Sequence, residues 1–191
     1  REIAELDPYL KVTLFQEGIT PENIDVFLTA GGKLDMLAEE CDSIEIKILA
    51  REHARSLRIP VIMDTSDRGL VDVERFDLEP ERQLLHGMLD GLDLSLIGRS
   101  MTNEEKLPFM ARMVGLETIS DRMRASLPEI GKTILTWPQL ASGVVLGGAI
   151  LADVSRRILT GHEVLSQRQW IDLDALIPVT TNEVESLSPI A

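Results

Sequence analysis

Residues Leu34–Thr65 read LDMLAEECDSIEIKILAREHARSLRIPVIMDT, and the remaining elements are arranged around them. The apolar residues of Leu34–Cys41 predict a strand, and apolar side chains at helical spacing predict a helix over Ile44–Arg58. The short apolar run around Pro60 predicts a second, buried strand over Ile59–Thr65. A strand, a helix and a second strand in about 30 residues form a βαβ unit, with parallel strands and a right-handed crossover.

Asp42 occupies the position in this unit where function is expected. Ligands of parallel sheets bind at the carboxyl ends of the strands, and Asp42 follows the first predicted strand. Its carboxylate suits a Mg²⁺ ion whose other ligands are substrate phosphates. Alternatively, Asp42 and Ser43 cap the helix that begins at Ile44, and their residue types favour this structural interpretation.

The composition is that of an acidic globular protein with one sizeable domain. The chain has 191 residues, of which 44% are hydrophobic, and a net charge of −13. This charge argues against a nucleic-acid binder, because such proteins cluster Lys and Arg. The longest apolar run, Leu140–Ala152, is shorter than the ~20 residues that a membrane span needs. Cys41 is the only cysteine, so neither a disulfide framework nor a four-cysteine zinc site is predicted, and a cytoplasmic location is the simplest interpretation.

Before the βαβ unit, the sequence predicts a helix end, a strand and a further helix. Residues 1–10 resemble the end of a helix, and Lys11–Phe15 alternates like a strand. Thr20 predicts the cap of the next helix, which the pair Gly31–Gly32 ends. The chain opens within a helical pattern and without an initiator Met, so we expect it to be a fragment of a longer protein.

After the βαβ unit, the pattern changes from parallel to antiparallel pairing. A turn at Ser66–Gly69 and alternation over Leu70–Glu74 predict a hairpin whose second strand has one exposed face. Asp77–Leu96 lacks a clean period and reads as loop with short helical or strand pieces. A helix is predicted over Asn103–Val114, and apolar residues continue at helical spacing as far as Pro128.

The longest predicted helix opens at Trp137 and runs to about Leu159. Its first half is apolar all round, so we expect it to be buried on most sides. Its glycines, within Gly143–Gly148, would let another backbone approach closely, and no strand precedes them as a dinucleotide-binding loop requires. Gln169–Ile177 alternates like a last strand, and the residues after it read as a tail or linker.

Other candidate sites have a structural alternative. The segment Gly31–Lys33 ends a helix and precedes a strand, whereas a phosphate-binding loop follows a strand and opens a helix. Cys41 could act as a nucleophile, but a thiol in a buried strand is more often an inert core residue. Asp64 and Asp67 could join Asp42 in an acidic ion site, although turn formation explains them more simply. The three histidines lie at no metal-ligand spacing.

The stretch Asp35–Ser43 resembles the strand pattern of the ThiF/MoeB family, relatives of the ubiquitin-activating enzymes: an Asp, apolar residues, an acid, two small residues and Asp-Asn. Ile59–Ile62 follows at the family's spacing, and Leu6–Pro8 is similar to a motif ahead of an earlier family strand. The glycine-bearing helix and Ile171–Leu173 resemble the closing helix and strand. The region Asp77–Lys132 matches poorly.

The resemblance implies a Rossmann-like α/β fold with a mixed sheet, in which a parallel βαβ part continues into antiparallel strands and helices flank the sheet. Residues 1–178 would form the carboxyl-terminal part of a ThiF-like adenylating domain. Within it, residues 99–132 would be a helical insertion, and residues 179–191 would be a tail or linker. The glycine-rich ATP loop would precede Arg1, so this chain alone is expected to bind ATP poorly or not at all.

The activity that the resemblance implies is ATP-dependent adenylation of the C-terminal carboxylate of a ubiquitin-like or sulfur-carrier protein. Asp42 matches the family aspartate that holds Mg-ATP, so it is the expected catalytic residue and Mg²⁺ ligand, with Ser43 and Lys47 beside it in the cofactor site. Ser43 replaces the family's usual Asn, and Lys47 stands where many members have Arg. The paired CxxC motifs are absent, which implies a zinc-free variant.

The resemblance also implies partners. We expect a homodimer formed through the apolar helix. The sequence also resembles actinobacterial ThiF-like domains that are joined to a nitroreductase-like domain, which implies a fused partner of that kind. Two alternatives stay open. One is a degenerate, non-catalytic ThiF-like module retained for dimerisation or as a scaffold, which the altered residues around Asp42 favour. The other is an α/β domain that binds a different nucleotide.

Overall fold

The computed structural model describes residues 1–97, 101–135 and 138–178, and these form a mixed α/β fold. Their sheet has four strands in the order β1-β2-β3-β4. The first pair is parallel and the next two pairs are antiparallel, which confirms the predicted fold class. The strands are β1 (Leu37–Ala38), β2 (Val61–Thr65), β3 (Leu70–Glu74) and β4 (Gln167–Trp170).

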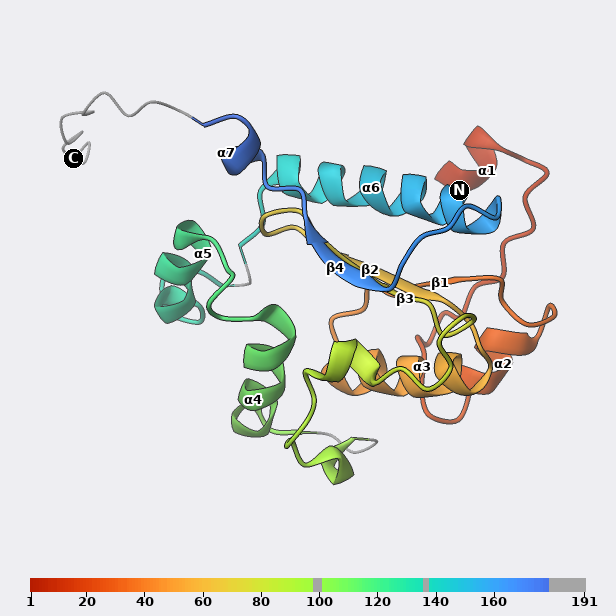
Figure 1. Cartoon of the computed structure of the whole chain (residues 1–191), viewed down its shortest axis with the longest axis horizontal. Helices are drawn as coiled ribbons and strands as arrows, with labels where there is room; N and C mark the ends of the chain where they lie inside the picture. The colour runs from red at the N-terminus through yellow and green to blue at the C-terminus, as the bar shows by residue number, and fades with distance from the viewer. Residues whose placement is uncertain (98–100, 136–137, 179–191) are drawn as a thin grey trace.

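Helices cover both faces of this sheet (Figure 1). Helix α6 lies along one face, and α3 with the short α2 lies on the other. Helices α4 and α5 stand beyond the end of the sheet where β2 turns into β3. The helices are α1 (Glu2–Leu6), α2 (Ile24–Thr29), α3 (Ile44–Ser56), α4 (Asn103–Val114), α5 (Asp121–Ser126), α6 (Ala141–Leu159) and α7 (Leu173–Leu176), with 3-10 turns η1 (Leu84–Gly87), η2 (Leu94–Leu96) and η3 (Leu127–Glu129).

The predicted βαβ unit is confirmed, although its first strand is shorter than the sequence indicates. The N–H groups of Leu37 and Glu39 donate to Pro60 and Ile62 across the parallel pair, each at 2.9 Å. The next available N–H, that of Cys41, donates instead to the Glu39 carboxylate at 2.9 Å. Because this backbone group turns to a side chain, pairing with β2 stops and the chain bends toward α3.

Strand β3 differs from the prediction because neither of its faces is exposed. All five of its residues are buried. Val71 and Val73 pack in a cluster with α6, whereas Asp72 and Glu74 point to the opposite face and form ion pairs there. The alternation of apolar and acidic residues therefore reflects two kinds of buried contact. A solvated face produces the same sequence pattern, so the pattern alone could not separate them.

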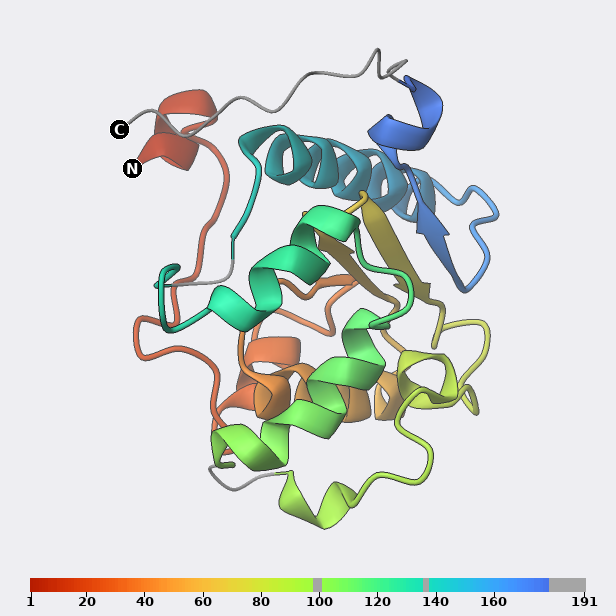
Figure 2. The ribbon, with the colours of Figure 1, turned by 90° about the vertical axis from the view of Figure 1, so that its left-hand side faces the viewer.

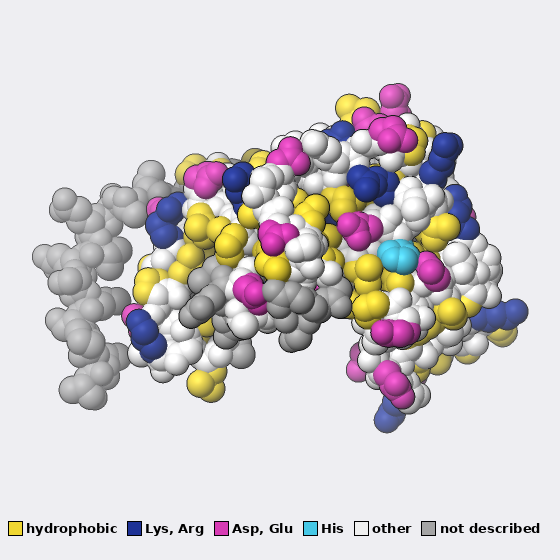
Figure 3. All heavy atoms as spheres, turned by 90° about the horizontal axis from the view of Figure 1, so that it is seen from below, with side chains coloured by type: hydrophobic (Ala, Val, Ile, Leu, Met, Phe, Trp, Pro, Cys, Tyr) yellow, Lys and Arg dark blue, Asp and Glu magenta, His cyan; other side chains and the backbone are white. Residues whose placement is uncertain are grey.

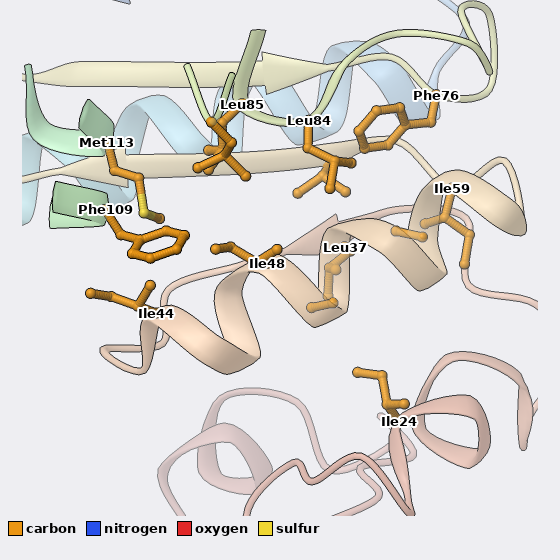
Figure 4. Packing of buried hydrophobic residues seen from close by; sticks show 14 of the residues in the cluster. Ile24, Leu37, Ile44, Ile48, Ile59, Phe76, Leu84, Leu85, Phe109 and Met113 are labelled. Carbon is orange, nitrogen blue, oxygen red and sulfur yellow. The ribbon is translucent and has the colours of Figure 1, made fainter. Parts of the chain in front are cut away.

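The main hydrophobic core lies between the sheet and α3 (Figure 4). Ile44 and Ile48 of α3 face Phe109 and Met113 of α4, so the inserted helix is fixed to the βαβ unit by apolar packing. Residues of a second cluster, centred on Ile62, lie between the sheet and α6. The sheet is therefore packed between α6 on one face and α3 on the other, and α4 packs against α3.

Helix α6 corrects a second expectation. Only Gly147 is buried in this helix among its described residues, and Val145 in its first half is 72% exposed. The expectation of burial on most sides is therefore wrong for this chain taken alone. The close approach predicted for the glycines is present, because Cβ atoms at Gly143 and Gly147 would overlap with Ser66 and with the Asp64 carboxylate.

Several element boundaries also differ from the predictions. Lys11–Phe15 forms no strand, and of the helix predicted before Pro128 only α5 is helical. The last strand begins two residues early, at Gln167, and its predicted second half is helix α7. The Asp172 carboxylate accepts the Asp174 N–H at 3.1 Å and so starts α7. Trp137 and the tail from 179 onward lie outside the described residues.

None of the helices in the described part of the chain is both long and apolar enough to cross a lipid bilayer.

Candidate functional site

A cavity of about 570 Å³ lies at the carboxyl ends of β1 and β2. The end of the sheet, α6 and the α4–α5 insertion surround it, and Figure 2 shows these two inserted helices in front of the strand ends. This is the edge at which parallel α/β sheets bind ligands, and the volume is that of an ordinary small-molecule site. The location predicted from Asp42 therefore coincides with this cavity.

The cavity has an acidic wall and an apolar wall. The acidic wall comes from the β1–α3 connection and the end of β2, and it carries Glu40, Asp42, Asp64 and Asp67. The apolar wall comes mainly from the insertion and α6, through Met110, Met113, Ile119 and Val144. Acidic and apolar side chains are also interspersed, with some basic ones, over the face of the molecule seen in Figure 3.

Asp42 is exposed on the acidic wall and does not cap α3. Ser43 is the N-cap instead, because its hydroxyl accepts the Ile46 N–H at 3.2 Å and donates to the Glu45 carboxylate at 2.9 Å. No donor among the described residues hydrogen-bonds to the Asp42 carboxylate. The capping interpretation therefore applies to Ser43. Asp42 is an exposed residue of the cavity wall, and no described hydrogen bond ties its carboxylate to the fold.

The donor set at Asp42 fits one kind of metal site. Among the described residues, no three His, Cys, Asp or Glu side chains converge closely enough to hold a metal ion by themselves. One exposed carboxylate beside a cavity is nevertheless the usual protein share of a Mg²⁺ site whose remaining ligands are phosphates and water. The residues present are thus compatible with a metal that arrives bound to a phosphorylated ligand.

Lys47 also lies on the cavity wall, where Glu39 holds it. Its Nζ donates to Oε1 and Oε2 of Glu39 at 3.0 and 2.8 Å and lies 3.3 Å from the Met63 sulfur. Glu39 in turn contacts Arg51, whose Nε donates to Glu74 at 2.6 Å. The guanidinium of Arg51 beside Glu39, together with Lys47, keeps the pKa of the buried Glu39 carboxyl below its ordinary value despite its burial.

Glu40 and Asp64 form a carboxyl pair at the carboxyl end of β2. The Asp64 N–H donates to Glu40 Oε1 at 2.8 Å. Although part of Glu40 is exposed, burial of its carboxyl raises its pKa to about 7, and the charge of Asp64 adds to this rise. Burial also raises the pKa of Asp64. Two acids in contact cannot both be charged without cost, so this pair retains a proton at higher pH than isolated carboxyls would.

Asp67 serves to anchor the insertion. The backbone N–H and the hydroxyl of Ser120 donate to its two carboxylate oxygens at 2.9 and 2.6 Å. The neighbouring Arg68 donates to the Thr118 carbonyl at 2.6 Å and pairs with Asp172 at 2.7 Å. Asp42, Asp64 and Asp67 do share one cavity wall, but the contacts of Asp67 are those of a structural residue.

Cys41 lies near the same wall as a protonated thiol. Its Sγ donates to Glu39 Oε1 at 2.8 Å. Burial raises its pKa to about 12, and the hydrogen bond to Glu39 acts in the same direction. A nucleophilic cysteine needs a thiolate, so the surroundings of Cys41 favour the inert interpretation.

Sequence reasoning missed the contribution of the insertion. Lys106 of α4 reaches the cavity and pairs with Glu45 of α3 at 3.2 Å, and methionines of α4 form much of the apolar wall. The helical period of α4 indicates an apolar stripe, but it does not reveal that the stripe faces the carboxyl end of a sheet more than 30 residues earlier in the chain. The pair of Arg51 and Glu74 was also missed, since it joins residues far apart in sequence.

Comparisons with known proteins give one close relative. The chain is 42% identical over 177 residues to uncharacterized protein MT1398 of Mycobacterium tuberculosis (strain CDC 1551 / Oshkosh), a match that includes 93% of this chain. It spans only 24% of the length of that relative. No protein-family model matches the sequence, and no solved structure matches it.

Proposed function

We propose that the chain is the metal-carrying part of an ATP-dependent adenylyltransferase of the ThiF type, which activates the C-terminal carboxylate of a ubiquitin-like or sulfur-carrier protein. One observation carries the proposal. Asp42 is exposed and lines a cavity of about 570 Å³ at the carboxyl ends of β1 and β2, while Ser43 performs the capping that could have explained both residues.

Magnesium bound with ATP would neutralise charge on the phosphates while a carboxylate attacks the α-phosphate. The task of Asp42 would be to hold that ion at the strand ends. Lys47, on the same wall, would add a second positive charge near the phosphates, and Ser43 would keep the start of α3 in place. The apolar wall of the insertion would exclude water from the reacting groups.

Pyrophosphate exchange into ATP by the full-length protein tests the proposal. Exchange that requires Mg²⁺ and a carrier-protein tail is expected, and Asp42→Asn is expected to reduce it at least ~100-fold, as for removal of a metal-holding group in phosphoryl transfer. Asp90→Asn, which removes an exposed carboxylate outside the cavity, is the matched control and should retain the exchange rate. Absence of both exchange and ATP binding with any carrier tail would reject the proposal.

A non-catalytic scaffold is the second candidate, and the exposed apolar side chains of α6 favour it. Val145 is exposed on the first half of this helix, and so is Leu140 just before its first residue. Such a patch is typical of an interface, and a homodimer formed through α6 would cover it. Light scattering of the full-length protein and of Val145→Asp tests this: a dimer that dissociates in the variant, without any ATP binding, would leave only the scaffold role.

The remaining expectations are part of the same proposal. A cytoplasmic location follows from the chemistry of an ATP-dependent enzyme with one protonated, partly buried cysteine. A fused nitroreductase-like domain is consistent with the greater length of the mycobacterial relative, of which this chain spans about a quarter. Sequencing of the polypeptide on both sides of this chain would test that expectation.

A further inference from the structure

Glu39 receives more donors than it needs. Its Oε1 accepts from the Cys41 N–H at 2.9 Å and from the Cys41 thiol at 2.8 Å, and its Oε2 accepts from Arg51. Lys47 adds bonds to both oxygens. These five hydrogen bonds exceed the roughly four acceptor positions of a carboxylate, and the three that do not come from Lys47 still occupy most of those positions.

The two cations on Glu39 differ in how far they can move. Arg51 is fully buried, and its Nε is tied to Glu74 on β3 while Nη1 also donates to the Lys47 carbonyl at 3.0 Å. Lys47 is 15% exposed and lies on the cavity wall. Its one further hydrogen-bond partner within the described ranges is the weak acceptor Met63. Arg51 is therefore the fixed counter-ion of Glu39, and Lys47 is the movable one.

A ligand with negative groups in the cavity would find few other cations. Lys106, the second lysine on the wall, already pairs with Glu45 at 3.2 Å. Among the described residues of the wall, the other charged groups are the carboxylates of Glu40, Asp42, Asp64 and Asp67. A lysine can leave its carboxylate partner and turn toward an anion at low cost only if a second cation keeps that carboxylate neutralised.

We propose that Glu39 holds the Lys47 ammonium in reserve for the phosphates of a ligand in the cavity, and that Arg51 keeps Glu39 paired when Lys47 turns away. The inference rests on the proposed function, which supplies the phosphorylated ligand. The inference adds to the site a carboxylate, that of Glu39, which positions Lys47 and also competes with the phosphates for Lys47. Glu39 is thus a positioning residue, and its charge lowers the affinity for polyphosphate.

Because Glu39 and the phosphates compete for Lys47, removal of the buried Glu39 charge should strengthen the binding of polyphosphate. Titration calorimetry of the full-length protein with sodium tripolyphosphate in the presence of Mg²⁺ measures it. Glu39→Gln keeps an acceptor for the Cys41 N–H and leaves Arg51 paired with Glu74, and it should bind the probe about threefold tighter or more, because one unit charge near the anion is removed. Glu81→Gln, which removes an exposed charge away from the cavity, should bind as the wild type does.

Lys47 shows whether the gain has the proposed cause. Lys47→Met alone should weaken binding about threefold or more, and in the Glu39→Gln background it should abolish the gain. Lys33→Met, at an exposed lysine outside the cavity, controls for net charge. Unchanged or weaker binding by folded Glu39→Gln, a gain that survives in the double variant, or no measurable binding by wild type and Glu39→Gln alike would overturn the inference.

If Glu39→Gln does not fold, Lys47→Met decides alone, since unchanged affinity would show that Lys47 stays with Glu39. Pyrophosphate exchange separates this inference from the proposed function. Lys47-dependent tripolyphosphate binding without exchange by the wild type would reject adenylation and retain the reserve role of Lys47. Exchange at the same rate and the same KM for ATP in Lys47→Met would retain adenylation and reject that role.

Discussion

Gly147 of α6 lies directly against the carboxylate of Asp64, so closely that a Cβ atom at this position would overlap with it. The contact places the longest helix against the end of β2, where the acidic wall of the cavity begins. A glycine within a helix usually lowers stability by about 1 kcal/mol relative to alanine. Here the missing side chain allows α6 to approach the end of β2 closely.

Gly143→Ala, one turn earlier in α6, should destabilise the protein in spite of the better helix propensity of alanine. Its Cβ would overlap with the backbone carbonyl of Ser66, which cannot turn aside as the Asp64 side chain beside Gly147 can. Forcing a methyl group into this contact should cost roughly 1–3 kcal/mol of unfolding free energy, measured by urea denaturation. Gly148→Ala is the matched control, because nothing lies within 4 Å of its added Cβ. That variant should be neutral or stabilised by up to about 1 kcal/mol. Equal effects at the two positions would contradict the packing described.

Substitution of Ser43 should lower the unfolding free energy, whereas substitution of Asp42 should change ligand binding and leave the unfolding free energy nearly unchanged. Ser43→Ala removes the side chain that accepts the Ile46 N–H at the start of α3, so it should lower the unfolding free energy by about 1 kcal/mol. Asp42→Asn should leave the unfolding free energy within about 0.5 kcal/mol of the wild type, as for a surface substitution. Thermal and urea denaturation of both variants measure this, and a larger loss in Asp42→Asn would return Asp42 to the role of a helix cap.

The parts of the fold that the sequence predicted are those whose sequence patterns lie within one short segment of the chain. Helix α3 and its parallel strands were predicted because apolar spacing, a cap and Pro60 all lie within one short segment. The early end of β1 depends on one side chain that captures a backbone N–H, which hydropathy does not report. The exposure of α6 was not predictable, since an apolar helix can be covered by its own domain or by a partner.

The candidate site was predictable only in its first part. The position of Asp42 at a strand end follows from topology, and the cavity beside it agrees with that reasoning. The apolar wall, with Met110 and Met113, comes from an insertion that joins the site through tertiary packing. The ion pair of Arg51 and Glu74 requires the register of β3 against β2, and no sequence pattern specifies it.

Arg51→Met should be severely destabilising. It would leave the buried carboxylates of Glu39 and Glu74 without their shared cation, a change that typically costs roughly 3–5 kcal/mol. Arg156→Met removes an exposed arginine that pairs with Asp153, and it should change the unfolding free energy by less than about 1 kcal/mol. Guanidinium denaturation of both variants gives the comparison. A small loss in Arg51→Met would mean that the buried ion pairs contribute little to the fold.

Glu40 should make stability decrease with rising pH. Its pKa in the folded protein is about 7, above the ordinary value of 4.5, so the folded state binds more protons than the unfolded state between these values. The stabilisation is fully present below pH 4.5 and is lost as the pH rises through 7. The unfolding free energy of Glu40→Gln should therefore fall less between pH 5 and pH 8 than that of the wild type.

Urea titrations at intervals across that pH range, with Glu81→Gln as an exposed control, measure the difference. Parallel pH profiles of the wild type and Glu40→Gln would show that the carboxyl pair of Glu40 and Asp64 does not retain its proton near neutral pH.

The most direct test of the central claim is the affinity of the full-length protein for ATP, measured by calorimetry with and without Mg²⁺. If Asp42 holds the metal of a phosphorylated ligand, ATP should bind only with Mg²⁺, and Asp42→Asn should weaken that binding at least tenfold, about 1.4 kcal/mol. Equal affinity of the wild type and Asp42→Asn for Mg-ATP, or no binding by either, would contradict the assignment of this cavity to adenylation.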